Sequence, residues 1–177
     1  MEKTLNSKII YEGKILTLTL DEVELQDGSH TYREVVHHNG GVCILAVKNN
    51  KIILVKQHRY PNHIDTLEIP AGKLELNEDT AACALRELEE ETNNRAKSVK
   101  FITKFLPTPG YTSEWLHLYE AYDFEEVDDS LDGDDDEFID VVYMDLDVAY
   151  SKVLSCEIND AKTMIAIMYA YNKKKER

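Results

Sequence analysis

The stretch GKLELNEDTAACALRELEEETNN, residues 72–94, is the most informative part of the chain. From position 79 to position 93 its apolar residues recur at spacings of three and four, which predicts an amphipathic helix. Asn77 or Asp79 is placed to cap the start of this helix, because both side chains can accept hydrogen bonds from the first free backbone N–H groups. The stretch therefore predicts a helix over residues 79–93.

Four of the five positions from Glu87 to Glu91 are glutamates. Glu87 and Glu91 lie one helical turn apart on the same face, with Glu90 beside them. Like charges at this spacing repel each other by roughly a few tenths of a kcal/mol per pair, and the C-terminal end of a helix also disfavours negative charge. Bound cations would offset both effects, and oxygen ligands suit magnesium or manganese. On spacing alone, a solvated acidic helix face is an equally good interpretation.

The longer spacing resembles the Nudix box, Gly-x5-Glu-x7-Arg-Glu-U-x-Glu-Glu-x-Gly-U, where U is a bulky aliphatic residue. Seven of the nine specified positions match: Gly72, Glu78, Arg86, Glu87, Leu88, Glu90 and Glu91. Asn93 replaces the second glycine and Asn94 replaces the final aliphatic residue. Asparagine is the next most tolerant residue in the left-handed conformation that ends a helix. Neither change removes a metal ligand of the box.

The resemblance implies a Nudix fold, an α/β (α+β) domain with a mixed sheet sandwiched between helices. It makes Glu87 and Glu91 the principal ligands of Mg²⁺, with Mn²⁺ as an alternative and Glu90 as a third ligand. The backbone carbonyl of Ala71 is expected to contribute as well. Arg86 is expected to orient carboxylates, including the one of the box's first glutamate, rather than to touch the substrate. Such a site would neutralise and orient a pyrophosphate.

The segments before the box indicate strands. Residues 14–36 alternate apolar and polar side chains around a turn at Asp27 and Gly28, which predicts a hairpin or meander. Residues 41–47 and 52–57 form a second hairpin signal. We therefore expect an N-terminal antiparallel β region at 1–38, followed by a Nudix hydrolase domain at 39–177.

The segments after the box return to strand and then to helix. Strands are expected at 99–105, 115–122 and 138–144, and helices at 147–154 and 160–175. The last helix is expected to bury one apolar face, made of Ala161, Met164, Ile165, Met168 and Tyr171. Residues 123–137 hold ten acids in fifteen positions, which predicts a solvated loop.

The composition restricts the partners. The chain has 20 basic and 34 acidic residues and a net charge of −14, so we expect it to bind neither nucleic acid nor acidic membranes. No apolar run reaches the length of a membrane span, and the first residues lack the pattern of a secretory signal. Cys43, Cys83 and Cys156 have no zinc-site spacing. These features favour a cytoplasmic protein.

Further stretches resemble those of ADP-ribose pyrophosphatases: residues 32–36, 55–60, 67–75 and 107–114, with Pro109 fifteen positions beyond Asn94. On this resemblance Arg33 and Arg59 are candidate phosphate or nucleotide contacts, since a planar guanidinium suits a phosphate. A surface salt bridge is nearly as good an interpretation of each.

Two acids are further candidates for substrate contact. Glu68 is expected to meet substrate hydroxyls or a metal, and Glu114 a ribose hydroxyl, whereas a solvated strand residue and a solvated loop acid are the alternatives. The resemblance also places the catalytic base on a loop before a late strand. This makes Glu137 the first choice and Asp136 the second, with Glu90 and Glu114 next.

The function expected from these residues is hydrolysis of a nucleoside diphosphate sugar, with ADP-ribose giving AMP and ribose 5-phosphate. Other sugar nucleotides, NADH, FAD and dinucleoside polyphosphates are alternative substrates. A Nudix module that binds nucleotides without turnover is a further alternative, although it would have no chemical need for the intact glutamates. Relatives of this type form homodimers through their N-terminal strands, and residues 14–36 suit that role, although on their own they are equally well interpreted as an ordinary addition to the sheet.

Overall fold

The computed structural model describes residues 1–131 and 138–176. Its contacts divide the chain into two compact units, a β unit of residues 1–40 and 105–116, and a main unit of residues 41–104 and 117–177. None of the described helices is long and apolar enough to cross a membrane.

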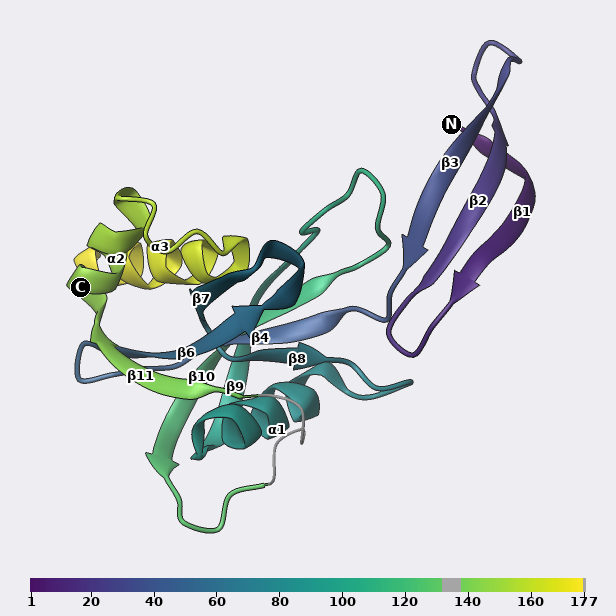
Figure 1. The fold of residues 1–177 in the computed structure, drawn as a ribbon. Coiled ribbons are helices and arrows are strands. Elements are labelled where there is room, and N and C mark those ends of the chain that lie inside the picture. Colours follow the sequence, from purple (N-terminus) through teal and green to yellow (C-terminus); the bar gives the residue numbers. More distant parts are fainter. Residues whose placement is uncertain (132–137, 177) are drawn as a thin grey trace. The chain divides into compact units, whose positions relative to one another are not determined.

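The β unit contains a three-stranded antiparallel sheet in the order β1-β2-β3 (Figure 1). Its strands are β1 (Lys3–Glu12), β2 (Thr17–Glu24) and β3 (His30–His37). The predicted hairpin is confirmed as β2 and β3, which turn at Gly28 with a φ of +81°. Strand β1 was missed, because all ten of its residues are exposed and give no burial pattern. The unit also includes residues 105–116, which the sequence analysis had assigned to the Nudix domain.

The described residues of the main unit form two four-stranded sheets. One has the strand order β8-β4-β10-β9, and the other has the order β11-β6-β5 with β7 also paired to β6. The strands are β4 (Gly41–Leu45), β5 (Val47–Lys48), β6 (Lys51–Arg59), β7 (Ile64–Glu68), β8 (Ala71–Lys73), β9 (Asn94–Phe105), β10 (Leu116–Glu126) and β11 (Asp140–Asp145). Strands β5 and β6 join through Asn49 and Asn50, both with positive φ, as a two-residue hairpin requires. The acidic segment 123–137 was predicted to be a loop, but strand β10 extends to Glu126. The first four residues of the segment are therefore strand.

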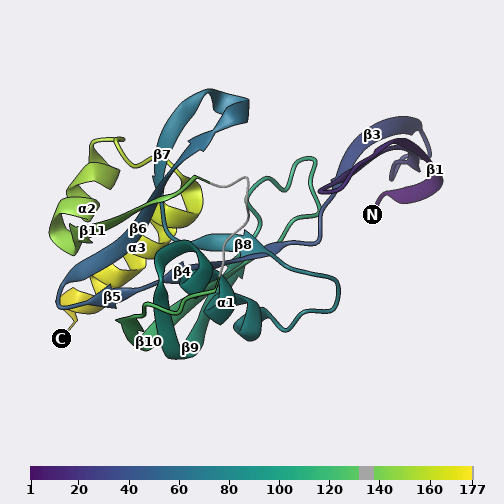
Figure 2. The same cartoon turned by 60° about the horizontal axis from the view of Figure 1, so that its bottom comes forward.

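In the described part of the chain, three α-helices flank these strands: α1 (Thr80–Thr92), α2 (Leu146–Leu154) and α3 (Ala161–Lys175). A 3-10 helix, η1 (Tyr60–Asn62), links β6 to β7. Figures 1 and 2 show α1 on one side of the strands and α2 with α3 on the other. This is the predicted arrangement of a mixed sheet between helices. It brings the box helix against β4 and β8.

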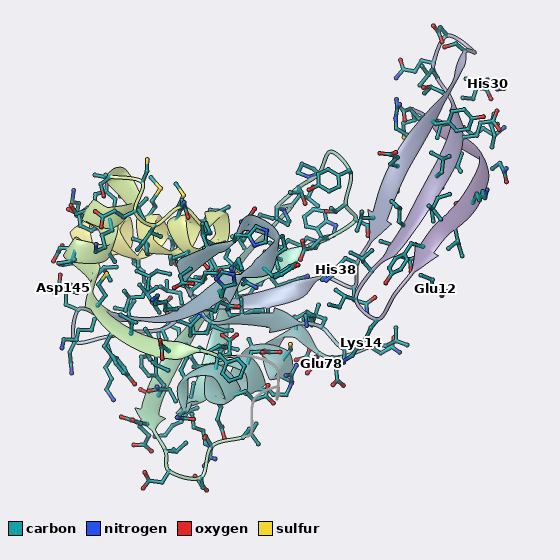
Figure 3. All side chains as sticks on the ribbon, in the orientation of Figure 1. Glu12, Lys14, His30, His38, Glu78 and Asp145 are labelled. Atoms are coloured by element: carbon teal, nitrogen blue, oxygen red, sulfur yellow. The ribbon has the colours of Figure 1, made fainter. Side chains whose placement is uncertain are left out.

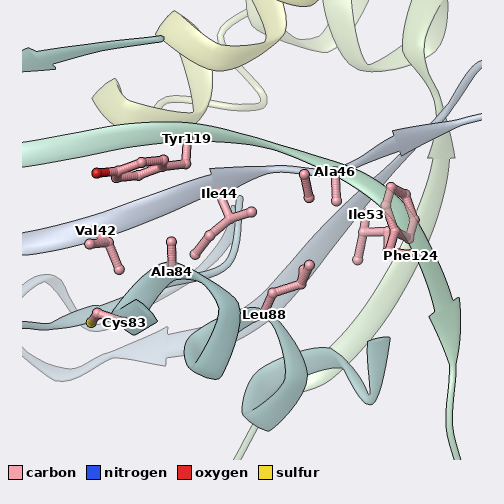
Figure 4. Packing of buried hydrophobic residues seen from close by; sticks show 10 residues of the cluster. Val42, Ile44, Ala46, Ile53, Cys83, Ala84, Leu88, Tyr119 and Phe124 are labelled. Carbon is pink, nitrogen blue, oxygen red and sulfur yellow. The ribbon is translucent and has the colours of Figure 1, made fainter. Parts of the chain in front are cut away.

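The core between α1 and the sheet is built from side chains that are almost completely buried (Figure 4). They come from β4, β6, β10 and α1: Val42, Ile44, Ile53, Cys83, Ala84, Leu88, Tyr119 and Phe124. Leu88, the aliphatic residue between the box glutamates, has no exposed surface. The apolar face of α1 is therefore fixed against the sheet, and its acidic face is turned elsewhere.

The predicted orientation of α3 is wrong. Ile165 and Met168, assigned to the buried face, are exposed, with relative accessibilities of 38% and 41%. The buried face consists of Lys162, Thr163, Ala166, Ile167 and Ala170. Thr163, Ala166 and Ala170 on this face are small, which lets the helix approach its neighbours closely.

Candidate active site

The box helix begins and ends as its sequence predicts. Asp79 is the N-cap, and its carboxylate accepts hydrogen bonds from the backbone N–H groups of Ala81 (3.1 Å) and Ala82 (2.9 Å). Asn93 ends the helix in the left-handed region, with φ 55° and ψ 26°. Its side-chain oxygen also accepts a hydrogen bond from Ser130 Oγ at 2.7 Å. The asparagine thus replaces the conformational role of the box glycine and adds a contact that glycine lacks.

Arg86 lies at the centre of the box carboxylates. Its Nη1 donates to Glu87 Oε1 at 2.8 Å and to Glu90 Oε2 at 2.7 Å. Its Nε and Nη2 donate to the two oxygens of Glu78 at 3.1 and 3.2 Å. Figure 3 labels Glu78 near the box helix. The expectation that Arg86 orients carboxylates agrees with these contacts.

The pKa values of Arg86 and Glu78 are shifted by the charges and hydrogen bonds that they share. Burial opposes the charged form of Arg86, but its hydrogen bonds to Glu78 and the charge of Glu87 raise its pKa above the ordinary value. The hydrogen bond from Arg86 in turn lowers the pKa of Glu78. One guanidinium faces three carboxylates, so the group carries an excess of negative charge that a cation would balance.

The backbone at the start of β8 meets the same carboxylates. A Cβ at Gly72 would lie 1.8 Å from the carboxyl carbon of Glu87, so only glycine permits this approach. The Ala71 N–H donates to Glu91 Oε2 at 3.0 Å. The fold therefore brings together the predicted metal ligands Ala71, Glu87, Glu90 and Glu91.

The donor set fits a hard divalent cation. Carboxylates from consecutive turns of α1 supply oxygen ligands alone, as magnesium and manganese prefer. Within residues 1–131 and 138–176, no three or more acidic, histidine or cysteine side chains already form a metal-binding group. Arg86 holds one oxygen each of Glu87 and Glu90, so a cation would have to share these carboxylates with the guanidinium.

Arg59 and Glu68 form a second polar group in the main unit, at the ends of β6 and β7. Arg59 Nε donates to Glu68 Oε1 at 2.6 Å, and Nη2 donates to Oε2. Glu68 is only 2% exposed, so the alternative of a solvated strand residue is wrong. Burial opposes ionisation of Glu68, but the hydrogen bond from Arg59 and the charge of Lys162 lower its pKa to about 2.

Arg33 and Glu114 belong to the β unit. Arg33 Nη2 donates to Glu2 Oε1 at 2.7 Å and Nε to Oε2 at 3.1 Å, which is the salt bridge considered as an alternative for it. Glu114 Oε1 lies 3.6 Å from His38 Nδ1, and its side chain is 27% exposed. Their contacts with substrate stay predictions.

The expected catalytic bases, Asp136 and Glu137, lie outside the described residues. The described segment just before them is bound to the end of the box helix. Glu89 accepts hydrogen bonds from Arg95 at 2.9 and 2.8 Å and from the Leu131 N–H at 3.2 Å. Sequence reasoning missed Glu89, because the box leaves its position unspecified.

Two protein-family models match the sequence of this chain. The NUDIX domain matches residues 37–165, and the nucleoside diphosphate sugar hydrolase N-terminal domain matches residues 2–36. The chain therefore belongs to the Nudix family. Within that family, its N-terminal part is the one that the nucleoside diphosphate sugar hydrolases carry.

Several individual proteins are similar to this chain over most of its length. The chain is 43% identical over 169 residues to the ADP-ribose pyrophosphatase of Bacillus subtilis (strain 168), covering 95% of this chain and 91% of that protein. It is 40% identical, with the same coverage, to the methanol dehydrogenase activator of Bacillus methanolicus. A GDP-mannose pyrophosphatase of Yersinia enterocolitica is 30% identical over 148 residues, covering 78% of this chain and 76% of that protein.

A solved structure has the same fold. The crystal structure of an ADP compounds hydrolase superposes with a TM-score of 0.87 and covers 99% of this chain and 95% of its own. Its sequence is 22% identical, so this likeness concerns the fold. The predicted Nudix fold is confirmed.

Proposed function

We propose that this Nudix hydrolase cleaves the pyrophosphate of ADP-ribose in preference to that of other nucleoside diphosphate sugars, giving AMP and ribose 5-phosphate. The observation that carries this proposal is the carboxylate cluster around Arg86, closed by the backbone of Ala71 and Gly72. Relatives named ADP-ribose pyrophosphatase and GDP-mannose pyrophosphatase support the substrate class. The greater identity and coverage of the former favour ADP-ribose.

Glu87, Glu90, Glu91 and the carbonyl of Ala71 would hold Mg²⁺, with Mn²⁺ as a possible substitute. When bound, the metal supplies positive charge that neutralises and orients the pyrophosphate. The chain's own contribution is to keep the carboxylates fixed through Arg86 and through the Ala71 N–H. Such fixed groups lower the barrier because little reorganisation is needed during the reaction.

The remaining site residues are proposed from the family resemblance. Arg59 and Arg33 would bind phosphate, with Glu68 contributing through its contact with Arg59. Glu114 would meet a ribose hydroxyl, and Glu137 or Asp136 would accept the proton of the attacking water. Glu90 is the next candidate for the base. Comparing Glu137→Gln with Asp136→Asn separates these choices. Replacement of the true base should lower kcat by about tenfold or more with little change in KM.

We propose that the protein is a cytoplasmic homodimer that associates through residues 1–38. Large apolar side chains are exposed on the β unit, among them Ile9, Ile10, Tyr11, Ile15 and Tyr32, with relative accessibilities of 50% to 62%. A surface of this kind is typical of an interface with another chain. The three cysteines are free thiols, which suits a reducing compartment.

A substrate panel tests the proposed activity. The purified protein is incubated with magnesium and, separately, ADP-ribose, GDP-mannose, another ADP-sugar, NADH, FAD or a dinucleoside polyphosphate, and the products are separated by chromatography. We expect the highest kcat/KM for ADP-ribose, with AMP and ribose 5-phosphate as products. Higher efficiency on another substrate would reassign the preference. Nucleotide binding without any hydrolysis would instead identify a non-catalytic module.

A further inference from the structure

A buried ion pair joins helix α3 to the end of β7. Lys162 is 8% exposed and Glu68 is 2% exposed, and Lys162 Nζ donates to Glu68 Oε2 across 94 positions of sequence. Lys162 Nζ also lies 3.1 Å from Oδ1 of Asp160, the N-cap of the helix. Thr163 Oγ1, in the same helical turn, accepts the Ile69 N–H at 2.8 Å. The start of α3 is thus held to the strand end that carries Glu68.

Glu68 has its acceptor positions occupied. Its Oε1 accepts from Arg59 Nε and from Thr66 Oγ1, both at 2.6 Å, and its Oε2 accepts from Arg59 Nη2 and Lys162 Nζ. A carboxylate offers about four acceptor sites. A substrate hydroxyl or a metal would therefore have to displace one of these donors. Glu68 is placed to act through its partners rather than by direct contact.

Among residues 1–131 and 138–176, Arg59 donates side-chain hydrogen bonds to Glu68, which leaves the other edge of its guanidinium available. A guanidinium has five N–H donors in a rigid fork, and Glu68 uses the Nε side of it. The Arg59 side chain is 40% exposed. The hydrogen bonds with Glu68 raise the pKa of Arg59, and the charges of Asp160 and Glu91 add to this effect. Arg59 is consequently within electrostatic range of a box glutamate.

The network around Glu68 has a geometric consequence besides its effect on stability. The attraction in a buried ion pair is largely offset by the cost of removing its charges from water. Its clearest consequence is geometric, because Lys162 and Thr66 fix the carboxylate that fixes Arg59. A pre-positioned guanidinium loses less conformational entropy when it binds a phosphate.

We propose that Lys162 is a positioning residue for substrate binding, which holds Glu68 so that Arg59 presents its open edge to the pyrophosphate of a nucleoside diphosphate sugar. This inference rests on the proposed function. Lys162 itself touches no substrate. Its contribution is expected in KM rather than in kcat, because it orders a binding group before the reaction starts.

Lys162→Met tests this role by steady-state kinetics with ADP-ribose and magnesium. We expect KM to rise about five- to tenfold while kcat stays within about twofold, since uniform binding is lost. Lys174→Met is the matched control, because Lys174 lies on the same helix and pairs with Asp147 at the surface. The control should leave KM unchanged. If Lys162→Met does not fold, Lys162→Gln retains an amide donor and should give a smaller rise in KM.

A double-mutant cycle separates positioning from a general effect on the fold. In an Arg59→Ala background, adding Lys162→Met should change KM by less than about twofold, because the group it positions is absent. An equal rise in KM with and without Arg59 would overturn the inference, as would an unchanged KM in Lys162→Met. These results presuppose an active wild-type enzyme. A wild-type protein that hydrolyses no nucleoside diphosphate derivative would refute the proposed function and this inference with it.

Discussion

The carboxylate of Glu87 occupies the space that a side chain at Gly72 would fill. A Cβ there would lie 2.0 and 2.1 Å from the two carboxylate oxygens, far inside contact distance. The first glycine of the box is therefore explained by its contact with a glutamate fifteen positions later.

Gly72→Ala should consequently displace Glu87 and damage the activity more than the fold. We expect kcat for ADP-ribose to fall at least about 100-fold, the loss typical when a fixed electrostatic group is removed. The free energy of unfolding should fall by about 1–3 kcal/mol, as overpacking usually costs. Kinetics and urea unfolding measure the two effects, with Gly110→Ala as the control, because a Cβ at Gly110 meets nothing within 4 Å. Wild-type kcat in Gly72→Ala would refute the close packing.

Glu68 should make stability depend on pH in the acid range. Its pKa is lowered from 4.5 to about 2, so its contribution is fully present above pH 4.5 and is lost as the pH falls toward 2. The difference corresponds to about 3 kcal/mol over the whole range. Urea unfolding between pH 7 and pH 2.5 should show a smaller acid loss in Glu68→Gln than in the wild type. Identical pH profiles would contradict the assignment.

Asn93 should tolerate glycine but not alanine. Its φ of 55° lies in the left-handed region, which costs a residue with a Cβ about 1–2 kcal/mol unless, as in asparagine, a short polar side chain offsets the cost by local hydrogen bonds that alanine cannot make. Asn93→Ala should lower the free energy of unfolding by about that amount. Asn93→Gly should lose only the contact with Ser130, so its stability should match that of Ser130→Ala. Thermal unfolding of the three variants tests this, and equal losses for alanine and glycine would contradict the role of the backbone.

The proposed dimer should depend on the exposed apolar side chains of the β unit. Ile10→Asp places a charge on a side that would be buried between two copies, and this should yield a monomer by light scattering. Ser98→Asp, at an exposed position of β9 outside residues 1–38, provides a control for the added charge. If residues 1–38 complete a partner's site, the monomer should also have a higher KM. A monomeric wild-type protein with full activity would refute both statements.

The sequence pattern correctly predicted the ends of the box helix and the spacing of its glutamates. The cap at Asp79, the end at Asn93 and the glutamates one turn apart follow from helix geometry alone. The buried face of α3 did not follow, because Ala166 and Ala170 are selected by close packing while the larger Met168 remains exposed. The pairing of Lys162 with Glu68 could not be predicted from local patterns either, because the two residues are 94 positions apart in the sequence.

The central claim is that the box glutamates bind a divalent cation for pyrophosphate hydrolysis. The most direct measurement is the rate of AMP release from ADP-ribose by Glu91→Gln across a magnesium titration, with Glu125→Gln as a surface control. The amide can still accept the Ala71 N–H, so circular dichroism and melting should remain close to wild type. We predict a fall in kcat of at least about 100-fold and a similar loss for Glu87→Gln. A folded Glu91→Gln with near wild-type activity at limiting magnesium would contradict the account.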